Sequence, residues 1–227
     1  GGMEYPTLIT GMSVYNLPEG FRIVEIVTIH EFGHQYFMGM LASNEFEEPW
    51  LDEGFNTYLE NRILDNYYGE NTSFMSIYGF NIGDKQMSRA GYVGMSNPKI
   101  AENFRASWEY QHGGYGSLTY NKTGAWMATL EGIVGIETMN KIMKTYYKRW
   151  SFKHPCAKDF IAIVNEIVKE DHGNKFGENM QWYFDQVLYD TKVCDYAVAS
   201  ISNNKIYTNR GVYDENDGKS ILTDLMS

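Results

Sequence analysis

A short run in this sequence, His-Glu-Phe-Gly-His, places two histidines four positions apart with a glutamate directly after the first. Apolar residues recur around this run at the helical period, from Phe21 to Met38, and predict a helix there. Because positions four apart share one face of a helix, the imidazoles of His30 and His34 should point the same way. The pattern is typical of a zinc site in which Glu31, turned around the helix, reaches a water molecule instead of the metal.

The two histidines also allow a plainer interpretation, because both continue the apolar stripe of the predicted helix. A single histidine on such a stripe is more often a core residue than a metal ligand. With five histidines in 227 residues, the full pattern arises by chance in roughly one such sequence in a hundred. The motif therefore needs a third ligand to support it.

Glu53 supplies that ligand in the prediction. It lies nineteen positions after His34, on a second predicted helix that opens at Pro49. Two histidines and one glutamate leave a fourth tetrahedral position for water, which distinguishes a catalytic zinc site from a closed structural one. The alternative for Glu53 is an exposed helix carboxylate, and apolar neighbours such as Trp50 and Phe55 weigh against it. Asp52 is compatible with orienting a ligand and equally with a charge interaction at the helix start.

Four segments together resemble the aminopeptidase N family of zinc metallopeptidases, in the gluzincin clan. They are Gly2-Met3-Glu4, His30-Glu31-x-x-His34, Trp50-Leu51-Asp52-Glu53-Gly54-Phe55 and Tyr120-x-Lys122-x-Gly124. The resemblance covers about residues 1–190 and implies a mainly α fold with minor β, namely a thermolysin-like zinc catalytic domain. It also implies that the family's upstream β-rich domain and downstream helical domain are missing from this chain, which looks like a catalytic domain fragment.

The same resemblance assigns a role to the first residues of the chain. In the family, a strand that carries the Gly-x-Met-Glu motif lies along the substrate, and its glutamate binds the free α-amino group of the peptide. Here this implies a substrate-binding segment of Gly2, Met3 and Glu4. A carboxylate at that place fixes an ammonium group at a set distance from the scissile carbonyl. Tyr5 departs from the asparagine that usually follows, which bears on how Glu4 is anchored.

Tyr120 matches the family tyrosine that donates a hydrogen bond to the developing oxyanion. Its alternative is a core tyrosine, and Tyr115 is near enough in sequence to compete for the role. Lys122 and Gly124, which complete the motif, favour Tyr120.

The residues and the resemblance together predict a zinc-dependent aminopeptidase that releases N-terminal residues from peptides by attack of an activated water, with Glu31 as general base. A thermolysin-like endopeptidase would share His30, His34, Glu53 and Glu31 but would not need Glu4. A non-catalytic binding module is a second alternative, weakened by the presence of Glu31. An isolated catalytic fragment that is inactive is a third.

Composition limits the partners that we expect. A formal charge of −10 argues against a nucleic-acid binder, because phosphate neutralisation needs clustered basic residues. No stretch has the eighteen or more apolar residues of a membrane span. The expected partner is a peptide with a free N-terminus, and the sequence assigns no compartment.

Periodicity gives the remaining organisation. An edge strand is expected in residues 3–10, where Pro6 disfavours a helix. Residues 67–116 should hold short helices joined by loops. Alternation after residue 196, around a turn at Asn203-Asn204, predicts a β-hairpin in residues 191–227 that begins a following β domain, after the catalytic domain of residues 1–190. Further helices are expected at residues 120–133, 137–150, 157–169 and 178–189.

Overall fold

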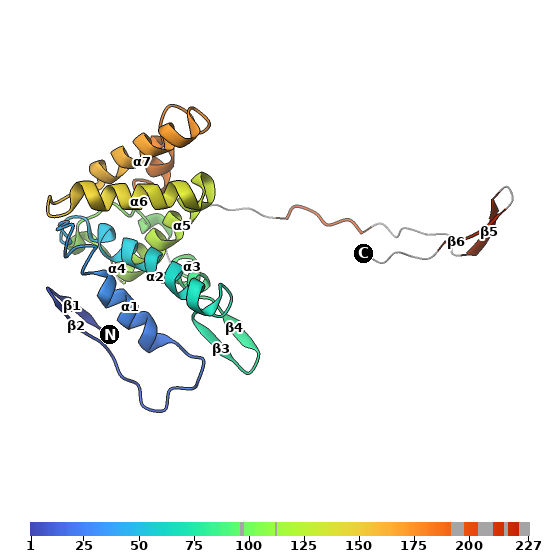
Figure 1. Cartoon of the computed structure of the whole chain (residues 1–227), viewed down its shortest axis with the longest axis horizontal. Helices are drawn as coiled ribbons and strands as arrows, with labels where there is room; N and C mark the ends of the chain where they lie inside the picture. The colour runs from blue at the N-terminus through green and yellow to red at the C-terminus, as the bar shows by residue number, and fades with distance from the viewer. Residues whose placement is uncertain (96–97, 112, 192–197, 204–210, 216–217, 223–227) are drawn as a thin grey trace. The chain divides into compact units, whose positions relative to one another are not determined.

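The computed structural model describes residues 1–95, 98–111, 113–191, 198–203, 211–215 and 218–222 (Figure 1). The chain divides into two compact units, Gly1–Val193 and Cys194–Ser227. In the second unit, β5 (Gly211–Glu215) pairs antiparallel with β6 (Gly218–Leu222). Residues 198–203 carry no strand, and residues 204–210, which hold most of the second strand of the predicted hairpin, lie outside the described residues.

The first unit is built mainly of helices, as predicted. They are α1 (Ile23–Gly33), α2 (Glu53–Tyr68), α3 (Asp84–Val93), α4 (Gly114–Gly116), α5 (Thr123–Val134), α6 (Ile136–Trp150), α7 (Ala157–His172) and α8 (Gln181–Val187). Short helical turns are η1 (Pro49–Leu51), η2 (Pro98–Ile100) and η3 (Ser107–Glu109), and η4 (Ser117–Lys122) is a π-helix. Two small antiparallel hairpins complete this unit: β1 (Met3–Tyr5) with β2 (Leu8–Thr10), and β3 (Met75–Ile77) with β4 (Phe80–Ile82). The prediction of a mainly α fold with minor β is confirmed.

The first hairpin differs from the single edge strand predicted for residues 3–10. Pro6 and Thr7 form a tight turn, and Thr7 adopts a positive φ of 63°, which is strained for a β-branched residue. The side chain of Gln35 stabilises this turn, because its Oε1 accepts a hydrogen bond from the Thr7 N–H at 2.9 Å and its Nε2 donates to the Tyr5 carbonyl at 3.1 Å. These bonds tie β1 to the segment that follows α1, and so place Glu4 beside that segment.

Helix α1 ends at Gly33, earlier than the predicted limit of residue 38, and it is less buried than its apolar sequence suggests. Only His30 and Glu31 of this helix are buried. Its opposite face borders an apolar cleft of about 620 Å³ between α1, α2 and α6, and Phe32 beside that cleft is 56% exposed. One face of α1 therefore carries the buried polar side chains of His30 and Glu31, while the opposite, apolar face remains partly exposed to solvent.

Two glycines allow α2 to approach its neighbours closely. A Cβ atom at Gly33 would collide with the side chain of Asn56, whose Nδ2 donates a hydrogen bond to the His30 carbonyl at 2.6 Å. A Cβ atom at Gly54 would collide with the side chain of Thr123 at the start of α5. These two crossings bring α1, the start of α2 and the start of α5 to one place.

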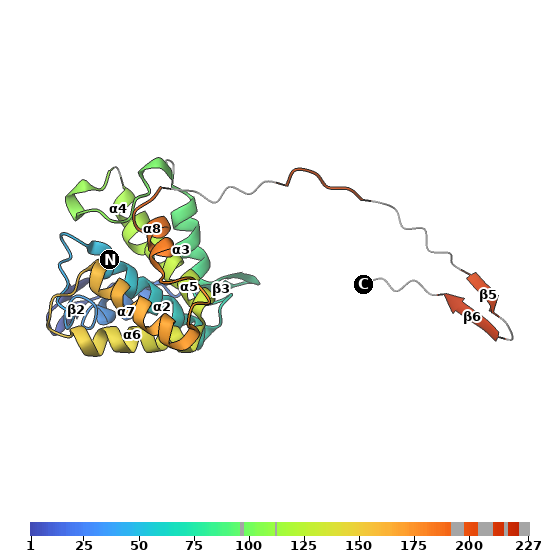
Figure 2. The ribbon, with the colours of Figure 1, turned by 90° about the horizontal axis from the view of Figure 1, so that it is seen from above.

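A core of aromatic and aliphatic side chains fixes α2 in that position. Phe55 lies at its centre, with ring centroids 4.7 Å from Phe160 and 5.7 Å from Tyr146, both in edge contacts. Helix α6 packs against both α5 and α7 (Figure 2). Because Phe55 and Trp50 are fully buried, the residues between them are held by the hydrophobic core.

The helix predicted to start near residue 120 begins with the π-helical segment η4. In this wider turn the Thr123 hydroxyl donates to the Leu118 carbonyl, five residues earlier, at 3.2 Å. Lys122 is buried and its Nζ donates to the Ala101 carbonyl at 2.5 Å, while burial lowers its pKa to about 8. Segments of this kind occur mostly as single turns within α-helices, frequently at functional sites. Among the described residues, no helix has the length and apolar character needed to cross a membrane.

Candidate active site

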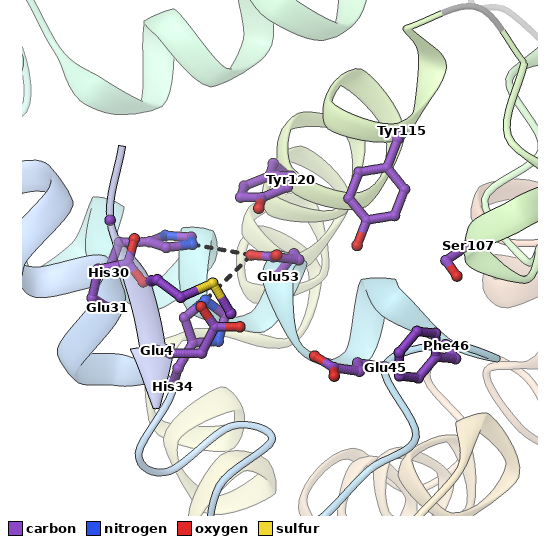
Figure 3. A pocket seen from close by; sticks show the side chains of 12 residues that line it. Glu4, His30, Glu31, His34, Glu45, Phe46, Glu53, Ser107, Tyr115 and Tyr120 are labelled. Atoms are coloured by element: carbon purple, nitrogen blue, oxygen red, sulfur yellow. Dashed lines mark hydrogen bonds and ion pairs between the residues drawn. The ribbon is translucent and has the colours of Figure 1, made fainter. Parts of the chain in front are cut away.

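A cleft of about 330 Å³ opens where β1, α1, the start of α2 and η4 meet (Figure 3). It contains every residue to which the sequence assigned a site role. The lining residues are Gly2, Met3, Glu4, His30, Glu31, His34, Glu45, Phe46, Glu53, Ser107, Tyr115 and Tyr120.

His30, His34 and Glu53 converge at the floor of the cleft. The Nε2 atoms of the two histidines lie 3.1 Å and 3.3 Å from the same atom, Oε2 of Glu53. Ligands that bind zinc at about 2.0–2.2 Å in a tetrahedron are about 3.3–3.6 Å apart, so this spacing is close to that of a zinc site. Two imidazoles and a carboxylate are also the donor set of catalytic zinc sites, and the residues present therefore fit the metal.

Carboxylates behind the histidines determine which ring nitrogen faces the cleft. His30 Nδ1 lies 2.7 Å from Glu60 Oε2, and His34 Nδ1 lies 2.5 Å from Asp52 Oδ1. Such carboxylate–histidine pairs orient the imidazole and increase its basicity as a ligand. Asp52 thus contacts His34 directly, which the sequence left open. Glu60 was missed, although its spacing of seven from Glu53 puts both on the same face of α2.

The electrostatics of this cluster favour a cation. Burial alone would lower the pKa values of the histidines, but hydrogen bonds with Glu53 and Glu60 raise that of His30 to about 10, and bonds with Asp52 and Glu53 raise that of His34 to about 11. Burial would raise the pKa of Glu53, yet its hydrogen bonds with the two histidines lower it to about 2. The carboxylates thus stabilise positive charge here, and a divalent metal ion can provide it in place of the protons.

Glu31 lies beside the histidine pair, next to the first residues of the chain. A Cβ atom at Gly2 would collide with the Glu31 side chain, so the backbone just before β1 passes close to this carboxyl group. Glu31 Oε2 has no hydrogen-bond partner within the part of the chain that the structure describes. Burial raises the pKa of Glu31, against the opposing effect of the two histidines. An unpartnered carboxylate oxygen is therefore available inside the cleft.

Glu4 reaches the cleft from β1, on the side of His34. One carboxylate oxygen of Glu4, one of Asp52 and a ring nitrogen of His34 lie within 4.8 Å of one another. Figure 3 shows Glu4 and Glu31 both near the histidine pair, with Glu45 farther from Glu31. The hairpin thus adds a second carboxylate next to the three converging ligands.

Two tyrosines, five positions apart, extend from the segment around η4 over the cleft. The ring of Tyr120 stacks on His30, with centroids 5.4 Å apart and planes at 16°. Burial raises the pKa of Tyr120, and the negative charge of Glu53 adds to this effect. The ring of Tyr115 is 6.4 Å from that of Tyr120, and its pKa is raised by burial as well. Both are protonated donors at neutral pH, and Tyr120 is the one in contact with the proposed ligands.

Three lining residues carry no sequence signal. Glu45 and Phe46 come from the loop between α1 and η1, and Ser107 starts η3. No motif or period marks these positions, because loops bring them to the cleft from separate parts of the chain.

A family model and several known proteins are similar to this chain. The family model for the peptidase family M1 domain matches residues 1–191. A leukotriene A-4 hydrolase homolog of Botryotinia fuckeliana is 26% identical over 220 residues, covering 92% of this chain and 33% of that protein. Aminopeptidase M1-D of Oryza sativa subsp. japonica is 23% identical over 182 residues, covering 75% and 20%.

A solved structure has a similar fold. It is an M1 zinc metallopeptidase variant from Deinococcus radiodurans bound to a Tyr-Ser-Ala substrate, with a TM-score of 0.60 and 20% sequence identity. The similarity covers 85% of this chain and 38% of that one. The chain spans about a fifth to a third of the length of the curated relatives it matches. Since the family model covers most of its sequence, the chain belongs to peptidase family M1.

Proposed function

We propose that this chain is the zinc-binding catalytic part of an aminopeptidase, which releases N-terminal residues from peptides. One observation carries the proposal: Glu4 lies in the same cleft as His30, His34 and Glu53, beside His34. A carboxylate next to the reacting centre binds the substrate's ammonium group and so requires a free N-terminus. The name of the Oryza sativa relative, aminopeptidase M1-D, agrees with this function.

Each residue then has a separate role. Zinc held by His30, His34 and Glu53 would lower the pKa of a water molecule and polarise the scissile carbonyl. Glu31 accepts a proton from the attacking water and delivers it to the leaving amine, a role that its unpartnered Oε2 supports. Gly2 leaves room for this carboxylate. Met3, the next residue, begins β1, the strand along which the substrate would lie.

Other parts of a longer protein would contribute further walls to the cleft. The curated relatives extend well beyond the region they share with this chain, which supports further domains as partners of the catalytic part. In their absence, the chain could bind zinc and remain inactive.

The first experiment compares an aminoacyl fluorogenic amide with its N-acetylated counterpart, together with the zinc content of the protein. We expect hydrolysis of the free-amine substrate alone. Glu4→Gln should lower kcat/KM for that substrate by roughly 10- to 100-fold, because a charge-assisted hydrogen bond contributes about 1.5–3 kcal/mol. Glu47→Gln, at an exposed position, is the control.

The outcomes separate the alternatives. Equal cleavage of the acetylated substrate would favour a thermolysin-like endopeptidase. Bound zinc without either activity would mean that further domains are needed. A chain that binds no zinc would contradict the proposal as a whole.

Tyr120 is proposed as the hydrogen-bond donor to the developing oxyanion, since it lies over His30 and Glu53. Tyr120→Phe should lower kcat by about 10²–10³ with little change in KM, the usual cost of removing one such donor. Tyr115→Phe should have a much smaller effect. Steady-state kinetics of both variants test this assignment, and the reverse order would transfer the role to Tyr115.

A further inference from the structure

We infer that Glu45 makes the cleft select peptides whose N-terminal residue has a basic side chain, lysine or arginine. The inference rests on the proposed aminopeptidase function and names the substrate class of the same cleft. It depends on where that side chain must lie, on the charge of Glu45 and on the walls around it.

The proposed roles fix the direction of the substrate. Its ammonium group lies at Glu4 and its scissile carbonyl at the ligand set, so the side chain of the N-terminal residue branches between these two points. The leaving amine must lie toward Glu31, which delivers a proton to it. Figure 3 shows Glu31 and Glu45 on opposite sides of the ligand set. The first side chain of the substrate is therefore directed away from Glu31, toward Glu45.

Glu45 presents a negative charge that the protein leaves unpaired. No lysine or arginine lines the cleft, and no ion pair of Glu45 is found among the residues that the structure describes. The charge of His34, which lines the same cleft, acts on Glu45 without an ion pair between them. Burial raises the pKa of Glu45, and the negative charges of Glu4 and Glu53 add to this effect. A cationic group placed beside Glu45 would offset both the energetic cost of burying the carboxylate charge and the repulsion from the other carboxylates.

The neighbours of Glu45 suit a long side chain with a charged end. Phe46 is 63% exposed, and with Tyr115 it provides apolar surface for the methylene groups of lysine or arginine. The loop itself is tied in place, because the Phe46 N–H donates to Asn44 Oδ1 at 3.1 Å and its carbonyl accepts from the Ser107 N–H at 2.8 Å. Glu45 is therefore held at the edge of the cleft by its chain neighbour.

Hydrolysis of lysyl and norleucyl fluorogenic amides tests the inference, since norleucine has a side chain of nearly the same length without the charge. In the unmodified chain we expect kcat/KM to be about tenfold higher for the lysyl substrate, as one charge-assisted contact provides. Glu45→Gln should reduce this ratio to about one, and change the norleucyl rate by less than about twofold. Glu47→Gln, two positions along the same loop and exposed, should keep the ratio of the unmodified chain.

A binding measurement separates this inference from the proposed function. Calorimetry of Lys-Ala-Ala, norleucyl-Ala-Ala and Ala-Lys-Ala with the zinc-loaded Glu31→Gln variant needs no turnover. We expect Lys-Ala-Ala to bind best, and its advantage to disappear when Glu45→Gln is added. If this preference is present but the unmodified chain cuts no substrate, the inference stands, and hydrolysis requires domains beyond this chain. Hydrolysis or binding without a lysine preference overturns the inference alone, as does a preference for Ala-Lys-Ala.

Discussion

Glu31→Gln is expected to lower kcat by about 10³-fold while the zinc content stays the same. Glutamine keeps the size of the side chain beside Gly2, but it cannot accept the proton of the attacking water. General acid–base catalysis typically contributes 10²–10⁴-fold, and Glu31 would serve both proton transfers. Steady-state hydrolysis of a free aminoacyl amide, with zinc measured by atomic emission on the same sample, provides the test.

Glu25→Gln is the matched control, because Glu25 is an exposed glutamate on the same helix, α1. It should retain the activity of the unmodified chain. Full activity in Glu31→Gln would assign the proton transfers to another group. Loss of zinc in that variant would instead give Glu31 a part in building the metal site.

The second large effect concerns the metal. Glu53→Ala is expected to weaken zinc binding by at least about 100-fold. Even residues that only hydrogen-bond to the ligands change metal affinity by 10- to 100-fold when they are mutated. Activity should be lost with the metal. Stability should respond too, because a ligand present at 100 times its Kd stabilises the folded state by about 2.7 kcal/mol. Zinc titration against a competing chelator and thermal unfolding with and without EDTA measure both.

Two further variants make this test specific. Glu137→Ala removes an exposed glutamate of α6 and should keep both the zinc affinity and the chelator-sensitive Tm. Asp52→Asn separates the two candidate ligand groups, because Glu4, His34 and Asp52 also lie close together. A chain that keeps zinc in Glu53→Ala and loses it in Asp52→Asn would place the metal in that second group.

The candidate site could be predicted largely from the sequence, because its main parts are local. His30 and Glu31 lie in the last turn of α1, and His34 follows directly at its end with helical dihedral angles, so the spacing determines which side chains share a face. Glu53 lies on a different helix, and its place as third ligand was predicted from the sequence motif around it. Whether these residues act as proposed stays a prediction for the experiments above.

Residues brought in by tertiary contacts could not be predicted in the same way. The pairing of Glu60 with His30 depends on the close crossing of α1 and α2 at Gly33. Glu45 reaches the cleft because the backbone of Phe46 pairs with that of Ser107, more than sixty positions later. Neither contact leaves a pattern in the nearby sequence.

The fold shows the same division. Apolar periodicity located α2, α5, α6 and α7, since each buries one stripe in the core around Phe55. The β1–β2 turn was missed because Thr7 adopts its positive φ with the help of the distant Gln35. The hairpin of β3 and β4 was expected as helices and loops. Its turn has positive φ at Tyr78 and Gly79, and tyrosine is a weak signal for such a turn.

The π-helical segment η4 makes the number of residues in this region as important as their identity. An α-helix turns by about 100° per residue. If η4 lost one residue and became a regular α-helix, Tyr120 would therefore rotate by about this angle relative to α5. Its ring would leave the face of His30 although no atom of the tyrosine had changed. In the evolution of such a chain, a deletion or insertion between Tyr115 and Thr123 is therefore as damaging as replacing the tyrosine, and point substitutions there are the milder change.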